Sequence, residues 1–174
     1  RTMSLNKPIK FGFVRGPVWN FGDEDMKHGI EEFVKNAQLD IEELDLGKDF
    51  DDAAKAHEII MNGSIANSLM NYYQTDKSNL HPFTVKRIEA GTPVSASDYV
   101  SAIEQAKKME QILKQFFKKY DAIITPAAPG QAPRDLMNTG NAIFNGYWTM
   151  MGVPTISLPF LKGKDDLPIG IQFI

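Results

Sequence analysis

The sequence predicts an α/β fold, a mixed β-sheet flanked by helices, formed by residues 1–174 as a single unit. Near the N-terminus apolar residues alternate as in a strand, and in the middle of the chain they recur with helical spacing. From Pro126 onward the chain holds six of its ten prolines, with glycines between them, which is typical of loops and short strands. No internal repeat, low-complexity tract or flexible linker divides the chain.

A strand, a helix and a second strand are predicted first. Apolar residues alternate over residues 9–14, which indicates a strand. Acidic residues at 23–25 mark the start of a helix, because negative charge is favourable at a helix N-terminus, and its apolar stripe runs to residue 37. A short strand is expected over residues 42–46. This order predicts a parallel strand pair with the helix packed across the sheet.

A long helix is predicted to follow two aspartates at positions 51 and 52, with an apolar stripe that extends to Tyr73. Gly63 and Ala66 lie on this stripe, where small side chains allow a neighbouring element to approach closely. The polar residues 74–80 are expected to form a loop.

Two more helices are predicted before the proline-rich part. A short helix over residues 83–90 is expected to end at Gly91 as a C′ residue. Ser95 and Asp98 form an S-x-x-D signal for the start of a long helix. The apolar side of that helix reaches Tyr120, and its lysines gather towards the C-terminal end, which suits the helix dipole.

Composition excludes several classes of function. A chain of 174 residues is long enough for one domain with a sizeable core. Its net charge of −3 gives no electrostatic reason to expect a nucleic-acid or membrane partner. No window approaches the roughly 18 apolar residues that a membrane span requires. The absence of cysteine excludes disulfides, thiolate zinc sites and cysteine nucleophiles, and it is consistent with a cytoplasmic protein.

No set of residues in the chain forms a complete catalytic site. No serine lies in a G-x-S-x-G elbow, and no phosphate-binding glycine motif occurs. His28, His57 and His81 are isolated, so we interpret them as solvated or capping residues rather than bases. No histidine pair has the spacing of metal ligands. We therefore expect no catalytic residue, metal or cofactor in this chain.

Residues 120–159, YDAIITPAAPGQAPRDLMNTGNAIFNGYWTMMGVPTISLP, are the most informative stretch. An apolar strand, Ala122–Thr125, leads into a Pro/Gly loop and then an aromatic-rich segment, Phe144–Trp148. Gly-Val-Pro and a second apolar strand, Thr155–Leu158, follow. We interpret this stretch as residues that line one side of an active site but do not supply its nucleophile.

Five segments carry a family resemblance: F-V-R-G-P-V-W, A-G-T-P-V-S-A-S-D-Y, Y-D-A-I-I-T-P-A-A-P-G-Q-A-P, N-T-G-N-A-I-F-N-G-Y-W-T-M-M-G-V-P-T-I-S-L-P and D-L-P-I-G-I-Q-F-I. In this order they resemble the C-terminal half of amidase signature enzymes, over essentially the whole chain. The resemblance implies carboxamide hydrolysis by a serine nucleophile, a second serine on a cis peptide bond and a lysine base. Such a lysine must be neutral, so burial must lower its pKa. Backbone N–H groups would stabilise the oxyanion.

The Gly/Ser-rich stretch that carries those serines in the family is absent, and the chain has no Ser-Ser pair. In the family the triad lies N-terminal to every segment matched here. We therefore expect a truncated C-terminal portion of a larger amidase domain, inactive alone. The chain also starts at Arg1 and stops at Ile174 within an apolar run, whereas chain ends are usually polar and loosely held.

The resemblance implies that this chain lines the far side of an amide pocket. In the family, the loop after Y-D-A-x-x-T-P and the segment before G-V-P face the nucleophile. We therefore expect substrate contact or pocket shape from five residues: Thr125, Pro126, Phe144, Trp148 and Thr149. The alternative is that Phe144 and Trp148, which are four apart, form the buried stripe of a helix.

A related alternative is the A subunit of the glutamine-dependent tRNA amidotransferase. Those subunits carry an acidic residue ahead of G-V-P that holds the glutamine α-amino group, and the equivalent position here is Ala142. Lys86-Arg87-Ile88 resembles their K-R-R-I stretch, so Arg87 is a candidate for binding a carboxylate. Without the acidic partner, the sequence favours a general amidase.

Two further classes stay open: a non-catalytic α/β binding or interaction module, and a complete small-molecule-binding domain unrelated to amidases. On the amidase interpretation the partner of the intact enzyme is a small-molecule amide. A missing catalytic half would leave apolar surface exposed, so we expect a homo-oligomer.

Overall fold

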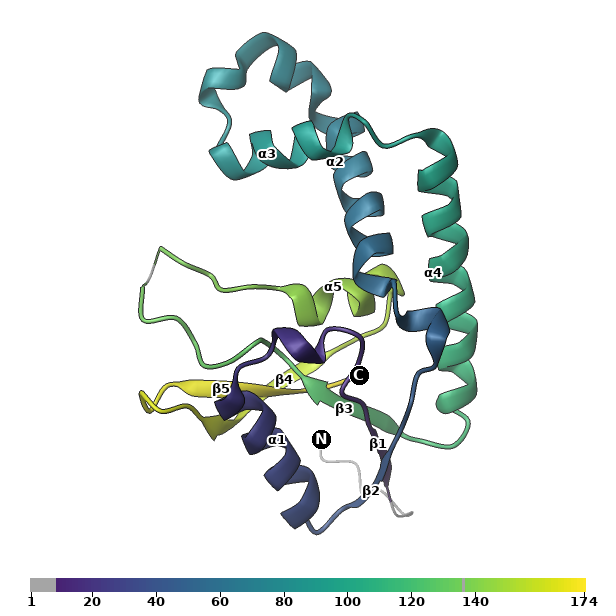
Figure 1. Ribbon diagram of the computed structural model, residues 1–174, viewed down its shortest axis with the longest axis vertical. Coiled ribbons are helices and arrows are strands. Elements are labelled where there is room, and N and C mark those ends of the chain that lie inside the picture. Colours follow the sequence, from purple (N-terminus) through teal and green to yellow (C-terminus); the bar gives the residue numbers. More distant parts are fainter. Residues whose placement is uncertain (1–8, 136) are drawn as a thin grey trace, which may run out of the picture.

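A five-stranded mixed sheet runs through the middle of the molecule (Figure 1). The computed structural model describes residues 9–135 and 137–174, so Arg1 lies outside it. The strands are β1 (Lys10–Phe13), β2 (Asp40–Glu43), β3 (Ala122–Pro126), β4 (Ile156–Lys162) and β5 (Pro168–Phe173). Their order in the sheet is β2-β1-β3-β5-β4; β1 pairs in parallel with β2 and β3, and β5 is antiparallel to β3 and β4. The predicted α/β fold with a mixed sheet is confirmed.

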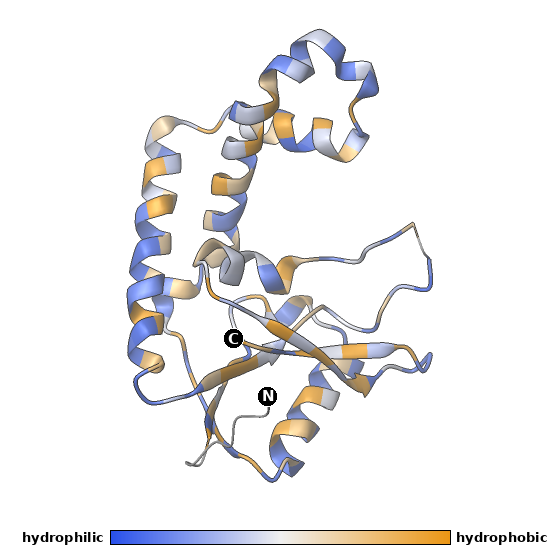
Figure 2. Cartoon of the chain, turned by 180° about the vertical axis from the view of Figure 1, so that it is seen from behind, coloured by the Kyte–Doolittle hydropathy of each residue, from blue (hydrophilic) through white to orange (hydrophobic). Residues whose placement is uncertain are grey.

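Helices cover both faces of this sheet (Figure 1). The helices are α1 (Glu24–Asn36), α2 (Ala53–Asp76), α3 (Pro82–Gly91), α4 (Ala96–Phe116) and α5 (Ile143–Met150). On one face lies α1; on the other, α5 separates the sheet from the lower end of α2, and α4 runs alongside α2. Figure 2 shows hydrophobic residues concentrated on the strands and alternating with hydrophilic ones along α4.

The predicted strand–helix–strand unit is present at the N-terminal end. Strands β1 and β2 pair in parallel, and α1 connects them. Asp23 caps α1, because its carboxylate accepts a hydrogen bond from the Met26 N–H at 2.8 Å. The strand expected over residues 42–46 instead runs from Asp40 to Glu43. Leu44 still donates to the Phe13 carbonyl oxygen at 2.8 Å, and the chain then turns at Gly47, where φ is +80°.

Residues 74–80, expected as a loop, are helical as far as Asp76 and continue into a 3-10 turn. The reason is a tertiary contact. The Lys77 ammonium donates to the Tyr73 hydroxyl at 2.8 Å and to the Glu89 carboxylate at 2.8 Å, which fixes the end of α2 against α3. The prediction of a loop was wrong because a contact between two helices cannot be recognised from the local sequence of residues 74–80.

The start of α4 agrees with its predicted signal. The Ser95 hydroxyl accepts from the Asp98 N–H at 3.0 Å and donates to the Asp98 carboxylate at 2.7 Å. By contrast, Gly91 is the last residue of α3 and does not lie beyond its end.

Small residues determine how the middle helices pack. A Cβ atom on Gly91 would lie 1.9 Å from the Asn62 carbonyl oxygen and 2.8 Å from the Ala66 Cβ, so α3 crosses α2 at close range. A Cβ on Gly63 would lie 3.0 Å from the Tyr99 ring of α4. The close approach predicted at Gly63 and Ala66 is therefore confirmed.

Within residues 9–135 and 137–174, no helix combines the length and apolar character needed to cross a bilayer.

Replacing Gly91 by alanine should lower the free energy of unfolding by about 1–3 kcal/mol, because the new methyl group would collide with backbone that cannot move freely. Gly29 of α1 is the matched control. A Cβ there would meet only the mobile end of Leu161, at 3.1 Å, so Gly29→Ala should be neutral or stabilise through helix propensity. Urea unfolding measures both variants. Equal midpoints would show that the crossing of α2 and α3 does not require glycine.

Candidate functional site

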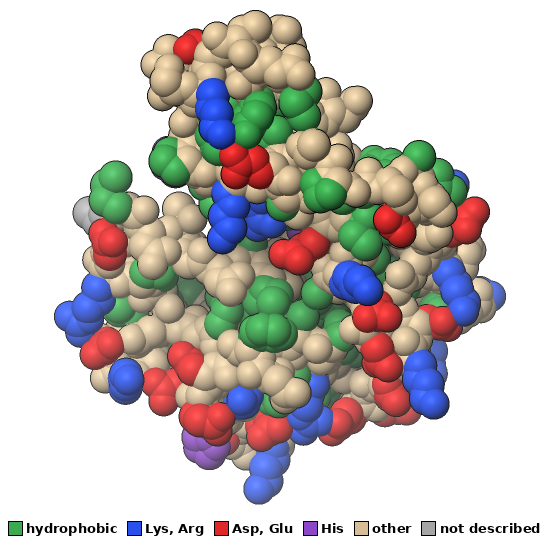
Figure 3. All heavy atoms as spheres, turned by 45° about the horizontal axis from the view of Figure 1, so that its top comes forward, with side chains coloured by type: hydrophobic (Ala, Val, Ile, Leu, Met, Phe, Trp, Pro, Cys, Tyr) green, Lys and Arg blue, Asp and Glu red, His purple; other side chains and the backbone are tan. Residues whose placement is uncertain are grey.

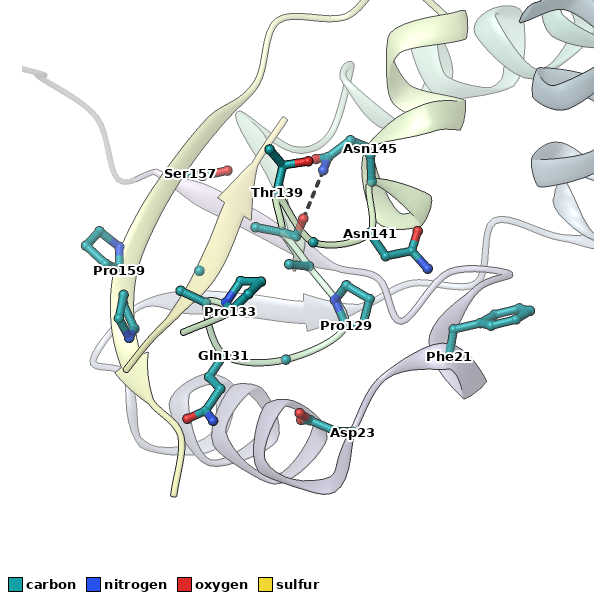
Figure 4. Close-up of a pocket in the computed structure, with 18 of the residues that line it drawn as sticks. Phe21, Asp23, Pro129, Gln131, Pro133, Thr139, Asn141, Asn145, Ser157 and Pro159 are labelled. Atoms are coloured by element: carbon teal, nitrogen blue, oxygen red, sulfur yellow. Dashed lines mark hydrogen bonds between the residues drawn. The ribbon is translucent and has the colours of Figure 1, made fainter. Parts of the chain in front are cut away.

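A cleft of about 680 Å³ opens beyond the end of β3, where the chain leaves the sheet (Figure 4). Three segments form most of its wall: the loop 127–133 after β3, residues 139–142 with Asn145 at the start of α5, and residues 157–159 of β4. Asp23 lies at its edge (Figure 4). All three segments belong to the stretch 120–159 that sequence analysis singled out.

A side-chain hydrogen bond joins α5 to the loop after β3. The Asn145 amide donates to the Ala127 carbonyl oxygen at 3.0 Å, across the cleft wall (Figure 4). The Asn141 side chain accepts from the Ile143 N–H at 3.0 Å and so orders the first turn of α5. The buried face of α5 then holds the helix against the sheet. Hydrogen bonds at the start of α5 and packing of its buried face therefore both hold this part of the cleft wall in place.

The loop after β3 also contacts the start of α1. The Asp23 N–H donates to the Pro129 carbonyl oxygen at 2.7 Å. A Cβ atom on Gly130 would lie 1.9 Å from the Asp23 carboxylate, so only glycine permits this approach. Because the same carboxylate caps α1, it is already engaged at the edge of the cleft.

The lining offers neutral polar groups on apolar walls. Side-chain amides come from Gln131, Asn141 and Asn145, and hydroxyls come from Thr139 and Ser157. The described lining residues include no histidine, lysine or arginine, and their one charged side chain, Asp23, is engaged in capping α1. This arrangement can bind a small polar molecule, and it offers a hydroxyl nucleophile no base other than that capping carboxylate among the described lining residues. Nor do the residues of the two described ranges include a group of three or more His, Asp or Glu side chains that could hold a metal ion.

Four of the predicted site residues are buried behind this cleft. Thr125 and Pro126 lie on β3, and Phe144 and Trp148 lie on α5; Thr125, Phe144 and Trp148 are each 0% exposed. The alternative interpretation of the two aromatic residues, as the buried stripe of a helix, is confirmed. In this conformation none of the four can touch a ligand, so their role in shaping the pocket stays a prediction.

The other two predicted residues lie elsewhere. Thr149 is exposed and lines a second pocket of about 390 Å³, between α2, α4 and α5. Arg87 of α3 donates to the Asn62 side chain at 3.2 Å and lies 3.7 Å from the Glu58 carboxylate. Neither residue is among those that line the larger cleft, so the structure does not bring the six predicted residues together.

The three histidines have different environments. His28 is exposed, 3.6 Å from Glu32, and His81 caps α3 by accepting from the Phe83 N–H at 3.2 Å, as predicted for solvated or capping residues. His57 differs, because it is partly buried against α5, where a Cβ on Gly146 would lie 2.6 Å from its Nδ1 atom. The sequence analysis did not predict this contact. Gly146, which stands among the aromatic residues of α5, is the one feature that could have indicated it.

The chain is similar in sequence to a known protein family and to several of its members. The model of the family described as Amidase matches residues 1–174. The A subunit of glutamyl-tRNA(Gln) amidotransferase from Aliarcobacter butzleri is 33% identical over 114 residues, which cover 59% of this chain and 25% of that protein. The corresponding subunit from Agathobacter rectalis is 28% identical over 203 residues, covering 97% of this chain and 40% of that protein.

A crystal structure of an amidase superposes with a TM-score of 0.83 at 17% identity, covering 99% of this chain and 42% of the other. At that identity the likeness shows the fold alone. The chain therefore spans 25–42% of the length of these three proteins.

The stability of this protein should depend on the titration of His57. Burial lowers the pKa of His57 from its usual 6.5, so the folded protein binds this proton less tightly than the unfolded chain does. The stability that neutral His57 provides is complete above pH 6.5 and is lost as the pH falls through the lowered pKa. We expect the free energy of unfolding to fall more steeply from about pH 7 to 5 in the parent than in His57→Gln. Urea unfolding at each pH measures both, and parallel profiles would contradict the expectation.

Proposed function

This chain belongs to the amidase signature family, and from that membership we propose that it forms one wall of a pocket for a carboxamide substrate. The proposal assigns the serine nucleophile, the second serine and the lysine base to a part of the family fold outside this chain. One observation supports it: the cleft beyond β3 has binding groups, and the one possible base among its described lining residues, Asp23, is engaged as the cap of α1. The chain alone would then be inactive, and its cytoplasmic location stays a prediction.

The cleft suits the chemistry of an amide. A carboxamide presents a carbonyl acceptor and N–H donors, so its site needs both donors and acceptors. The side chains of Asn141 and Ser157 supply both kinds of group from different sides of the cleft (Figure 4). Asn145 donates through its amide nitrogen to Ala127, which leaves its carbonyl oxygen as an acceptor. Apolar walls with a few polar groups are typical of small-molecule sites.

The two edges of the sheet differ in a way that supports further polypeptide beside β4. The outer strand β2 carries Asp40, Glu42 and Glu43, and charged residues protect a strand edge from pairing. The opposite edge, β4, has no charged residue before Lys162, and its Ile156 is 63% exposed, but Pro159 and a register shift between Leu158 and Leu161 interrupt the strand. Because proline and bulges also protect an edge, the part of β4 that could pair with another strand is Ile156–Leu158.

An amidotransferase A subunit is the second candidate, because the two curated relatives described above are subunits of that kind. Ala142 favours a general amidase, since the family resemblance places this alanine where amidotransferase A subunits carry an acidic residue for the glutamine α-amino group.

Amide hydrolysis by the longest reading frame that contains this chain tests the proposal. We expect ammonia release from simple amides by that protein and none from the 174-residue chain. Ala142→Trp, which fills the cleft, should lower kcat/KM by about tenfold or more, while Val100→Trp on the exposed side of α4 should not.

Three outcomes of this assay decide between the alternatives. Turnover by the chain alone that survives repurification would contradict the assignment of catalysis outside it. Full activity of the Ala142→Trp variant would exclude the cleft as the substrate site. Preference for glutamine over simple amides would favour the amidotransferase, and inactivity of the longest frame would favour a non-catalytic binding module.

Exposed apolar surface leads us to propose that the isolated chain self-associates. Figure 3 shows hydrophobic side chains in patches among charged ones, and such patches promote association. Lysine at Ile156 should convert a dimer or larger species to a monomer, because charge blocks edge-to-edge pairing. Val100→Lys, at a residue that is 54% exposed, is the control. Sedimentation velocity measures all three proteins, and a monomeric parent at high concentration would refute the proposal.

A further inference from the structure

The turn of the β4–β5 hairpin, residues 163–167, lies beside the loop that follows β3. The Gly163 N–H donates to the Leu167 carbonyl oxygen at 2.9 Å and so closes the turn. The Lys164 N–H donates to the Asp25 carboxylate of α1, also at 2.9 Å. The turn is therefore held both within its own hairpin and against α1, and it is a firm point to which the loop can attach.

One side chain of the loop binds this turn twice. The Gln131 Nε2 atom donates to the Asp165 carboxylate at 2.5 Å, and the Gln131 Oε1 atom accepts from the Asp165 N–H at 3.2 Å. The two bonds close a ring, so they fix the orientation of the two residues as well as their separation. The Gln131 amide lowers the pKa of Asp165 from its usual 3.8, so the carboxylate is ionised at neutral pH and accepts this bond.

Bare backbone lets the loop come this close to the turn. A Cβ atom on Gly163 would lie 2.4 Å from the Oε1 atom of Gln131 and 2.8 Å from its Cβ atom. In the next residue, the Ala132 N–H donates to the Pro168 carbonyl oxygen at 2.9 Å. The loop thus meets the hairpin through one side chain and one backbone hydrogen bond at neighbouring positions.

The ion pair beside this ring is the weaker contact. Arg134 lies 3.3 Å from the Asp165 carboxylate, and its side chain is 71% exposed. Ion pairs of that kind contribute little, because water and salt screen them. Gln131 is therefore the contact through which Asp165 holds the loop.

The loop carries this position to the cleft. Pro129 and Pro133 stand two residues to either side of Gln131, and both line the cleft (Figure 4). Because proline fixes the backbone φ angle, the loop is stiff and the two rings follow the position of Gln131. The Asp23 N–H binds the Pro129 carbonyl oxygen from α1. The loop is thus held at two points, one on α1 and one on the hairpin.

We propose that Asp165 is a positioning residue of the cleft, which acts through Gln131 to hold the loop 127–133 in the shape that binds substrate. This inference rests on the proposed function, because it takes the cleft to be the substrate site. Asp165 is not among the described residues that line the cleft, so it acts without touching the ligand. Its loss would leave the loop attached to α1 and at Ala132, and therefore in place but less ordered.

Amide hydrogen exchange tests the link to the loop and needs no substrate. In Asp165→Ala the Ala132 N–H should exchange about tenfold faster than in the parent, because opening the loop no longer breaks the bonds to Gln131. Asp165→Asn keeps an acceptor oxygen, so it should restore slow exchange. Asp166→Asn is the matched control, since Asp166 contacts Lys162 and has a φ of 60°, which asparagine also adopts. Unchanged exchange in Asp165→Ala would overturn the proposal.

Kinetics of the longest reading frame test the consequence for the substrate. Asp165→Ala should raise KM for a simple amide about three- to tenfold and change kcat by less than about twofold, because the loop shapes binding in the ground state and the transition state alike. Asp165→Asn should restore KM, and Asp166→Asn should leave it unchanged. An unchanged KM in Asp165→Ala, despite faster exchange in the loop, would refute the role in binding. If the longest frame hydrolyses no amide, the proposed function fails, and the exchange experiment still decides whether Asp165 holds the loop.

Discussion

The packing of α5 against the sheet is the constraint on which the cleft depends. A helix of eight residues is too short to be stable alone, so α5 exists because the sheet buries it. Phe144, Tyr147 and Trp148 are completely buried, and burial of a large apolar side chain contributes about 1.5–3 kcal/mol. From the same helix, Asn145 reaches the Ala127 carbonyl oxygen. The wall of the cleft is thus an extension of the core, and its geometry is set by packing.

The sequence predicted best those features that depend only on residues close together in the chain. Asp23 and Ser95 cap the helices that they were predicted to start, because a cap needs only the next few residues. The α/β order likewise follows from periodicities within each segment. The end of α2 was mispredicted because Lys77 is held by Glu89 of another helix. Gly91 was predicted as the C′ residue that ends its helix, whereas it lies within α3 and its small size is required by a neighbouring helix.

For the site, the family motifs contain the segments that line the cleft, but they do not reveal the direction of the side chains. Thr125 and Trp148 lie in the motifs that border the cleft, and both point into the core. Asn145, which holds the wall, stands in the same motif and carried no signal of its own. Asp23 reaches the cleft from α1, far away in the sequence, so only the fold could reveal it. A family motif indicates which segments border the cleft, and the burial of each side chain decides which of their residues face it.

Asp23 serves two elements at once. Its carboxylate caps α1, while its N–H binds the Pro129 carbonyl oxygen of the loop after β3. Gly130 presses against the same carboxylate, so the loop cannot shift towards α1 without disturbing the cap. If the cleft binds a molecule that moves this loop, binding would change the stability of the first turn of α1, and by reciprocity a change in that turn would alter the affinity. The shape of the cleft and the stability of the first turn of α1 are therefore coupled through Asp23.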